Sequence, residues 1–350
     1  MSSEEIIQKQ LDAYNNRVGN NTKKMKIRSL IILCSLLYSL TACENSAKKV
    51  IDYNKYHSEI ILAEELISQE KYEEALIRYE KLFNEYDFIF LRDYKIASQI
   101  SFLIGEKEKG LIYVKKAISN GWELIHLKEQ KFLSKNLLDS DWDTIEKQYE
   151  ELRNQFLNKI DSTLKNRVHS MFEKDQKIAY EAYIIEDEQG QEQFITENFP
   201  KHSEEQLVNL LEIIEINGYP GELLIGNDFW VSTILSHHNS QGTQYVKKDT
   251  LYDFIKPKLI QFLNEGYISP YEIALAEDWK KAVTSEWNES SYGYLNPPNT
   301  STISQINKTR KAIGLRTVAL RNKLIDIEAK TGMNFYLPDW VDGKIKIEEK

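Results

Sequence analysis

This sequence has few cysteines, no long apolar run and no familiar catalytic motif. Its two cysteines, Cys34 and Cys43, leave little scope for a scaffold held by disulfides. It has no Gly-x-Ser-x-Gly motif, no glycine-rich phosphate loop and no His-Glu-x-x-His pair, the marks of serine hydrolases, nucleotide-binding enzymes and zinc hydrolases. The longest mainly apolar run, residues 29–40, is too short to cross roughly 30 Å of hydrocarbon as a helix. We therefore expect no metal and no cofactor.

Basic side chains are outnumbered by acidic ones, 45 to 54, which leaves a formal net charge of −9. A nucleic-acid groove needs lysine and arginine clustered on one face, so this balance argues against a nucleic-acid partner. The contents of apolar residues, 41%, and of charged residues, 28%, are those of a soluble globular protein. A chain of 350 residues is long enough for one large domain or two ordinary ones.

Residues 25–42 have the organisation of a bacterial secretion signal. Lys26 and Arg28 provide a basic start, residues 29–40 an apolar stretch, and small residues precede Cys43. The sequence Leu-Thr-Ala-Cys at 40–43 resembles the bacterial lipobox, which implies that the chain is cut before Cys43 and acylated on its thiol. The alternative is a buried helix that ends in cysteine. The polar, lysine-rich stretch after Cys43 does not continue such a helix, so we favour the lipoprotein signal.

The chain from Cys43 onward is more acidic than the whole, with 39 basic and 51 acidic side chains. Such a surface does not bind anionic headgroups by charge, so the acyl group on Cys43 is expected to be the membrane anchor. Glu44 at the next position resembles outer-membrane sorting, which implies the outer membrane of a Gram-negative bacterium. Residues 1–24 are expected to be an upstream extension, with translation starting at Met25. A long basic leader is the alternative.

A polar tether, residues 43–54, leads into a helical and repetitive stretch, residues 55–156. Two pairs of positions recur at a spacing of 35 residues: Ala75 with Gly110, and Tyr79 with Val114. Small residues allow two antiparallel helices to approach, and the larger ones fill the space between them. The pattern resembles divergent tetratricopeptide repeats, whose usual period is 34 residues. That resemblance implies a groove for a protein partner, and a scaffold without a ligand is the alternative.

Two capping boxes predict helix starts further along the chain. Ser203, followed three residues later by Gln206, predicts that a helix begins there after a polar turn at residues 198–203. Ser269 with Glu272 forms the second box, with proline at the first helical position. This spacing accounts for Glu272 without a catalytic role.

Residues 157–350 are predicted to form a compact, mostly helical C-terminal domain, so the expected fold class is mainly α: helical hairpins followed by this domain. Three of its helices each place one strongly polar residue on the apolar side: His238, Asp278 and Arg310. A charge that faces a core is costly unless it is paired. We therefore expect the three residues to meet, with Arg310 and Asp278 in a bidentate pair and His238 nearby.

A series of short motifs follows in order through the C-terminal part, about residues 165–320: Met171-x3-Asp175-Gln176, Asn217-Gly218-Tyr219-Pro220, Gly226, the histidine of Ile234-Leu235-Ser236-His237-His238, Ala274-Leu275-x2-Asp278, Tyr292-Gly293, and Arg310-x3-Gly314-Leu315. In these motifs the chain resembles a bacterial family of domains of unknown function, catalogued as number 6624. The chain departs from the family at His237, Trp279 and Tyr294-Leu295, which puts any activity shared with the family in doubt. The resemblance itself implies no activity.

Three functions remain open for this chain. The first is an interaction or scaffold lipoprotein whose repeats present a groove to a protein partner. The second is a surface-anchored hydrolase in which Asp278 orients the imidazole of His238 for acid–base work, with Arg310 beside them. The third is a purely structural envelope component. A buried network that fixes helix packing explains the same three polar residues without any catalysis, and we favour it over the hydrolase.

Overall fold

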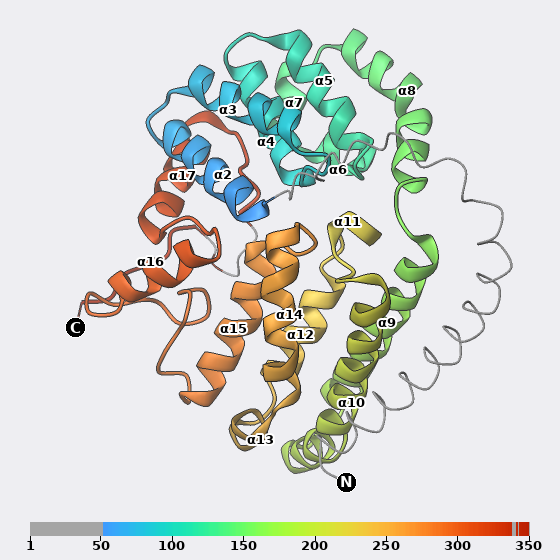
Figure 1. The fold of residues 1–350 in the computed structure, drawn as a ribbon, viewed down its shortest axis with the longest axis vertical. Helices are drawn as coiled ribbons and strands as arrows, with labels where there is room; N and C mark the ends of the chain where they lie inside the picture. Colours follow the sequence, from blue (N-terminus) through green and yellow to red (C-terminus); the bar gives the residue numbers. More distant parts are fainter. Residues whose placement is uncertain (1–51, 338–340, 342, 350) are drawn as a thin grey trace, which may run out of the picture.

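The computed structural model describes residues 52–337, 341 and 343–349. Within these ranges the chain forms sixteen helices and no strand, apart from an isolated bridge between Asn299 and Glu348 (Figure 1). The predicted mainly α class is thus confirmed. None of the described helices combines the length and the apolar character needed to cross a membrane. The leader and Cys43 lie outside the described residues.

The first two hairpins form the upper part of the molecule as drawn in Figure 1. They consist of α2 (Tyr53–Ser68) with α3 (Tyr72–Glu85), and α4 (Leu91–Leu103) with α5 (Lys107–Ile118). The residues paired by the repeat are buried on α3 and α5. A Cβ on Gly110 would lie 2.6 Å from the ring of Phe102, so only glycine permits this approach of α4 and α5. We call α2 to α8 the N-terminal lobe.

Three further helices complete the N-terminal lobe: α6 (Leu124–Glu129), α7 (Lys131–Asn136) and α8 (Asp139–Leu157). α8 packs on α5 and leads down to the rest of the chain (Figure 1). At its start Asp141 accepts a hydrogen bond from the backbone N–H of Leu138, which satisfies one of the free donors of the helix N-terminus.

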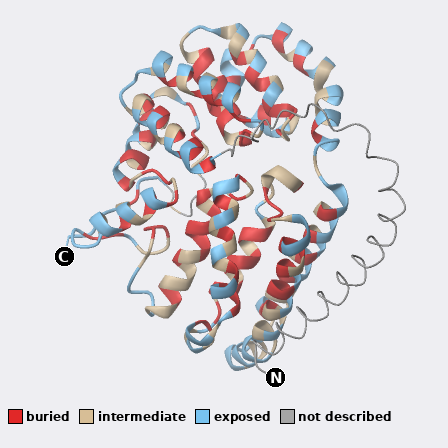
Figure 2. Cartoon of the chain, in the orientation of Figure 1, coloured by how far each residue is buried: buried red, intermediate tan, exposed pale blue. Residues whose placement is uncertain are grey.

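The C-terminal lobe comprises the helices from α9 to α16. They are α9 (Ser162–Tyr183), α10 (Glu188–Asn217), α11 (Glu222–Ile225), α12 (Trp230–Asn239), α13 (Thr243–Lys248), α14 (Leu251–Glu265), α15 (Pro270–Thr284) and α16 (Ile303–Ala312). α12 packs on α9, α10 and α15 at the centre. Figure 2 shows buried residues concentrated on the faces that these helices turn toward one another.

The two predicted capping boxes have different outcomes. Ser269 and Glu272 form the box that begins α15, with Pro270 at its first position, as predicted. The start predicted at Ser203 is wrong, because α10 runs through Pro200 without a break. Both polar side chains there are used in tertiary contacts instead. The Ser203 hydroxyl meets the imidazole of His238, and the Gln206 amide donates to a carbonyl of α9.

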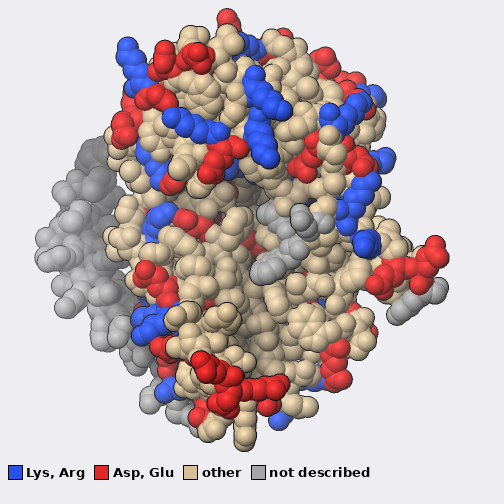
Figure 3. All heavy atoms as spheres, turned by 180° about the vertical axis from the view of Figure 1, so that it is seen from behind, with Lys and Arg blue, Asp and Glu red and all other residues tan. Residues whose placement is uncertain are grey.

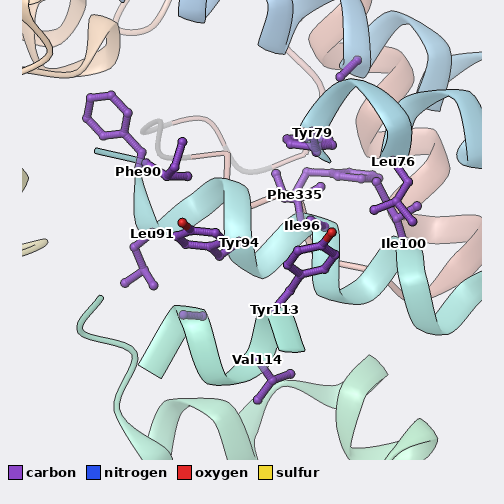
Figure 4. Packing of buried hydrophobic residues seen from close by; sticks show 14 of the residues in the cluster. Leu76, Tyr79, Phe90, Leu91, Tyr94, Ile96, Ile100, Tyr113, Val114 and Phe335 are labelled. Atoms are coloured by element: carbon purple, nitrogen blue, oxygen red, sulfur yellow. The ribbon is translucent and has the colours of Figure 1, made fainter. Parts of the chain in front are cut away.

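The end of the chain returns to the N-terminal lobe. α17 (Val318–Thr331) packs on α2, and the segment after it, residues 332–337, lies along α4; we call it the return segment. The side chain of Phe335 is fully buried, and Figure 4 shows it among residues of α3 and α4: Leu76, Tyr79, Ile96 and Ile100. The sequence predicts that residues 157–350 form one C-terminal domain. In the structure, however, α17 and the return segment complete the core of the N-terminal lobe.

Candidate functional site

The three polar residues singled out from the sequence are all buried. His238 is 1% exposed, and Asp278 and Arg310 are completely covered. Each lies on the inner side of its helix, α12, α15 or α16, as the helical period predicts. The structure thus confirms that all three residues are buried. Each charge must therefore be satisfied by partners inside the protein.

Asp278 is satisfied by the loop that follows α15. Its carboxylate accepts hydrogen bonds of 2.6–2.7 Å from three backbone N–H groups and of 2.9 Å from one hydroxyl: Ser291, Tyr292, Tyr294 and the side chain of Ser290. Burial raises the pKa of Asp278, and these donors partly oppose that rise. The residue therefore fixes a loop and has no free face toward solvent.

Arg310 holds the same loop from its other side. Its guanidinium donates to the carbonyl oxygens of Tyr292 and Arg316, both at 2.6 Å, and to the hydroxyl of Tyr294, whose ring it also covers. The predicted bidentate pair between Arg310 and Asp278 is therefore wrong. Loop donors satisfy Asp278, whereas loop oxygens and the carbonyl of Arg316 satisfy Arg310. A pairing argument based on helices alone does not consider such groups.

His238 lies between two groups that the sequence prediction did not include. Its Nδ1 is 2.6 Å from the hydroxyl of Ser203, and its Nε2 is 3.2 Å from the carboxylate of Asp249. Asp249 also accepts from the backbone N–H groups of Leu251 and Tyr252 at the start of α14. A serine, a histidine and an aspartate in contact invite a catalytic interpretation. All three side chains are sealed, however, so this network joins α10, α12 and α14.

The geometry consequently offers no support for an acid–base pair of His238 and Asp278. The imidazole and the carboxylate have separate sets of partners, and neither residue lines the cavity described below. A hydrolytic mechanism needs water at the acid and the base, and both groups are covered.

A second histidine cluster surrounds Asp175 on α9. His237 Nδ1 contacts one carboxylate oxygen, and His202 Nε2 lies 3.7 Å from the other. Burial alone would raise the pKa of Asp175, but the hydrogen bonds from these histidines outweigh it and lower the pKa. Asp175 belongs to the opening motif of the family resemblance. Among the described residues no group of three or more metal-binding side chains has the arrangement needed to hold an ion.

A cavity of about 470 Å³ lies between the two lobes. It is bounded by α2 and α4 on one side, and by α11 and the start of α15 on the other (Figure 1). The return segment forms a third wall. Its ionisable lining residues include Arg92, Asp93, Lys95, Glu222, Glu272 and Arg316, and its apolar ones include Ile61, Phe229, Tyr271 and Leu315. This volume suits a small organic molecule.

One wall of the cavity is held by a buried carboxylate that bridges two arginines. Glu64 of α2 is fully buried and receives 2.6 Å hydrogen bonds from Arg92 of α4 and from Arg316, which follows α16. A second bond of 2.8 Å makes the contact with Arg316 bidentate. Burial would raise the pKa of Glu64, but the two guanidinium groups outweigh it and hold the pKa below its ordinary value. Through Glu64 the two lobes are joined across the cavity.

Four of the lining groups have displaced pKa values. Burial raises the pKa of Glu222 to about 8 and that of Asp93 to about 6, and it lowers the pKa of Lys95 to about 8. His57 is neutral, since burial and the charge of Arg316 lower its pKa to about 3. Several displaced groups in one cavity are typical of a functional site, although ion-pair networks in purely structural positions produce the same effect.

Glu222 provides a pH test of this environment. Its side chain accepts a hydrogen bond from the backbone N–H of Leu91, the first residue of α4. A folded-state pKa of about 8, against an ordinary 4.5, means that the stabilisation due to the neutral carboxyl is complete below pH 4.5 and is lost as the pH rises through 8. Glutamine keeps the acceptor and cannot ionise. We expect Glu222→Gln to exceed the wild type in unfolding free energy at pH 8.5 by at least about 1.4 kcal/mol, one pKa unit.

The measurement is urea unfolding at pH 5 and pH 8.5. Asp93 and the other displaced groups are present in both proteins, so their titration largely cancels in the difference. Glu212→Gln, which alters an exposed carboxylate paired with Arg167, serves as the control and is expected to show no such pH-dependent gain. If Glu222→Gln and the wild type differ by the same amount at both pH values, Glu222 does not have the displaced pKa.

The residues of this cavity escaped the sequence prediction for a simple reason. Glu64 and Arg316 are 252 positions apart, and each is an ordinary charged residue in a helical or loop context. One local signal is Gly314, part of the Arg310-x3-Gly314-Leu315 motif. A Cβ at that glycine, whose φ is +76°, would lie 2.5 Å from the Cβ of His57. The motif thus marks a close contact with α2 at the cavity wall.

On the face shown in Figure 3, the charged side chains of the described residues do not gather into a second candidate binding site. Lysine and arginine are interspersed with acidic side chains over the N-terminal lobe, and the described residues form no continuous basic surface there. Comparisons of the chain with known protein families, with curated proteins and with solved structures found no match.

Proposed function

We propose that this chain is a lipid-anchored envelope protein that binds a small organic ligand in the cavity between its two lobes. The observation that carries the proposal is the cavity of about 470 Å³, in which ionisable side chains with displaced pKa values converge beside apolar ones. Such a combination is the usual composition of a ligand pocket: apolar walls supply burial and a few polar groups set orientation. The lipid anchor rests on the lipobox at residues 40–43.

The return segment favours this site over a protein partner in the repeat groove. The backbone N–H and carbonyl of Asn334 each form a 2.8 Å hydrogen bond with the side-chain amide of Gln99 on α4. Arg92 donates to the carbonyl of Phe335 at 2.9 Å. The face of α4 that would receive a partner peptide is thus covered by the protein's own chain, and the space left beside it is the cavity.

The anchor is tested by changing the acylated residue. We expect radiolabelled palmitate to enter the wild-type protein and to be absent from Cys43→Ser, which should also leave the membrane fraction, because the acyl group on Cys43 is the proposed anchor. Cys34→Ser is the matched control, since Cys34 is removed with the leader, and it should behave as the wild type does. A Cys43→Ser protein that matures and fractionates normally contradicts the anchor.

Ligand binding is tested by filling the cavity. Ile61 of α2 lines it, whereas the neighbouring Leu62 is exposed and does not. Saturation-transfer NMR of the full-length protein with a panel of small aromatic and aliphatic acids, amides and alcohols should reveal saturable binders. Their binding should be lost in Ile61→Trp and kept in Leu62→Trp. A panel without binders, or binding that Ile61→Trp leaves intact, contradicts the proposal.

A further inference from the structure

The arginines of the cavity are already neutralised by the protein. Arg92 and Arg316 share Glu64, and Arg92 also lies 3.4 Å from Asp93. Two guanidinium groups therefore face two carboxylates. Asp228, another lining residue, is paired with Lys165. These groups shape the cavity without leaving a charge for a ligand.

Lys95 is the cation that lacks such a partner. Within the described part of the chain its ammonium has no hydrogen bond or ion pair, and its close contacts are two aromatic rings, Trp122 at 5.1 Å and Tyr336 at 4.8 Å. Glu222 is the acidic group that acts on it electrostatically. With a pKa of about 8, Glu222 is mainly uncharged at neutral pH. The cavity therefore holds one cation without a fixed counter-ion.

Two polar atoms that border the cavity are also without partners. His57 Nε2 and the hydroxyl of Tyr336 are buried and make no hydrogen bond within the structure, although both residues line the cavity. Leaving a buried polar atom unsatisfied is unfavourable, so such atoms usually have a ligand or water as partner. The ring of Tyr336 lies against Lys95, so its hydroxyl makes this part of the cavity polar.

We infer that the cavity is a binding site for a monocarboxylate, whose anionic group pairs with Lys95 and whose apolar body lies against Phe229, Tyr271 and Leu315. The inference rests on the proposed function and names the class of its ligand. One uncompensated ammonium balances one negative charge. A phosphate monoester dianion would leave excess negative charge in an enclosed space, which is unfavourable. The hydroxyl of Tyr336, whose ring lies against Lys95, can complete the hydrogen bonds of the acid.

The test uses two probes of the same shape, phenylacetate and phenylacetamide, titrated calorimetrically into the full-length protein at pH 7. The wild type should bind phenylacetate at least about tenfold more tightly, because a charge-assisted hydrogen bond contributes 1.4 kcal/mol or more. Equal affinities, or no binding of phenylacetate, overturn the inference. This comparison needs no variant and therefore does not depend on how a mutant folds.

A second arm assigns the effect to Lys95. Lys95→Met should remove the preference for the carboxylate and leave the amide within about twofold of its wild-type affinity. Lys116→Met is the matched control: Lys116 also lies over aromatic rings, Tyr94 and Tyr113, but outside the cavity, and the preference should persist. A carboxylate preference that survives in Lys95→Met overturns the inference.

The outcomes separate the two proposals. If panel compounds bind, Ile61→Trp abolishes their binding, and phenylacetate has no advantage over the amide, the cavity remains a ligand site and only the carboxylate assignment falls. If Ile61→Trp leaves all binding unchanged, the cavity is not the site and both proposals fall.

Discussion

Glu64→Gln is expected to reduce the free energy of unfolding by about 3–5 kcal/mol, because removal of one partner leaves buried charges uncompensated. Glu64 has no exposed side-chain surface, and its partners Arg92 and Arg316 are 18% and 10% exposed. Glutamine keeps the shape but cannot balance two guanidinium groups. Urea unfolding at pH 7 measures the effect.

Glu70→Gln is the matched control for this experiment. Glu70 also joins the N-terminal lobe to α17, through Lys330, but both side chains are about half exposed. Exposed pairs contribute at most about 1 kcal/mol, so the control should lose no more than that. A loss of less than 1 kcal/mol in Glu64→Gln would contradict the role of Glu64 as the buried link between the lobes.

Phe335→Ala should cost about 3–5 kcal/mol, the range for deleting a buried phenylalanine ring. The ring of Phe335 enters the core of the N-terminal lobe (Figure 4), together with the side chain of Met333 from the same segment. Its loss should also increase amide hydrogen exchange at residues 332–337, since the largest apolar side chain that holds the segment in the core would then be missing. Denaturant unfolding and hydrogen exchange measure the two effects.

Ile77→Ala, on the solvent side of α3, controls for loss of apolar volume without burial. Ile77 is 64% exposed, and surface changes of this kind usually alter stability by less than about 0.5 kcal/mol. If Phe335→Ala has an equally small effect, the return segment is not part of the core, and the third wall of the cavity is not fixed as described.

Local patterns predicted a large part of the fold. The helical periods around His238, Asp278 and Arg310 predicted their burial, because the period of a helix depends only on neighbouring residues. The capping box at Ser269 and Glu272 predicted the start of α15 for the same reason. The box at Ser203 failed because its side chains find partners on α9 and α12, and such contacts outweigh a local preference.

The candidate site could not be predicted in the same way. Glu64, Lys95, Glu222 and Arg316 come from four separate elements, and no spacing between them repeats. The packing of the return segment against α4 could not be predicted either, because Phe335 lies in a short irregular segment with no periodic pattern. Pairing rules alone predicted the wrong partners for Arg310 and Asp278, since groups outside the helices satisfy each charge separately.

The indole N–H signal of Trp122 offers the most direct test of ligand binding between the lobes. Trp122 contacts Lys95 beside the cavity, whereas Trp287 is 56% exposed and belongs to the C-terminal lobe. In a full-length protein labelled with ¹⁵N-tryptophan and titrated with phenylacetate, the Trp122 signal should shift to saturation while that of Trp287 stays in place. A fixed Trp122 signal throughout the titration would contradict binding at this site.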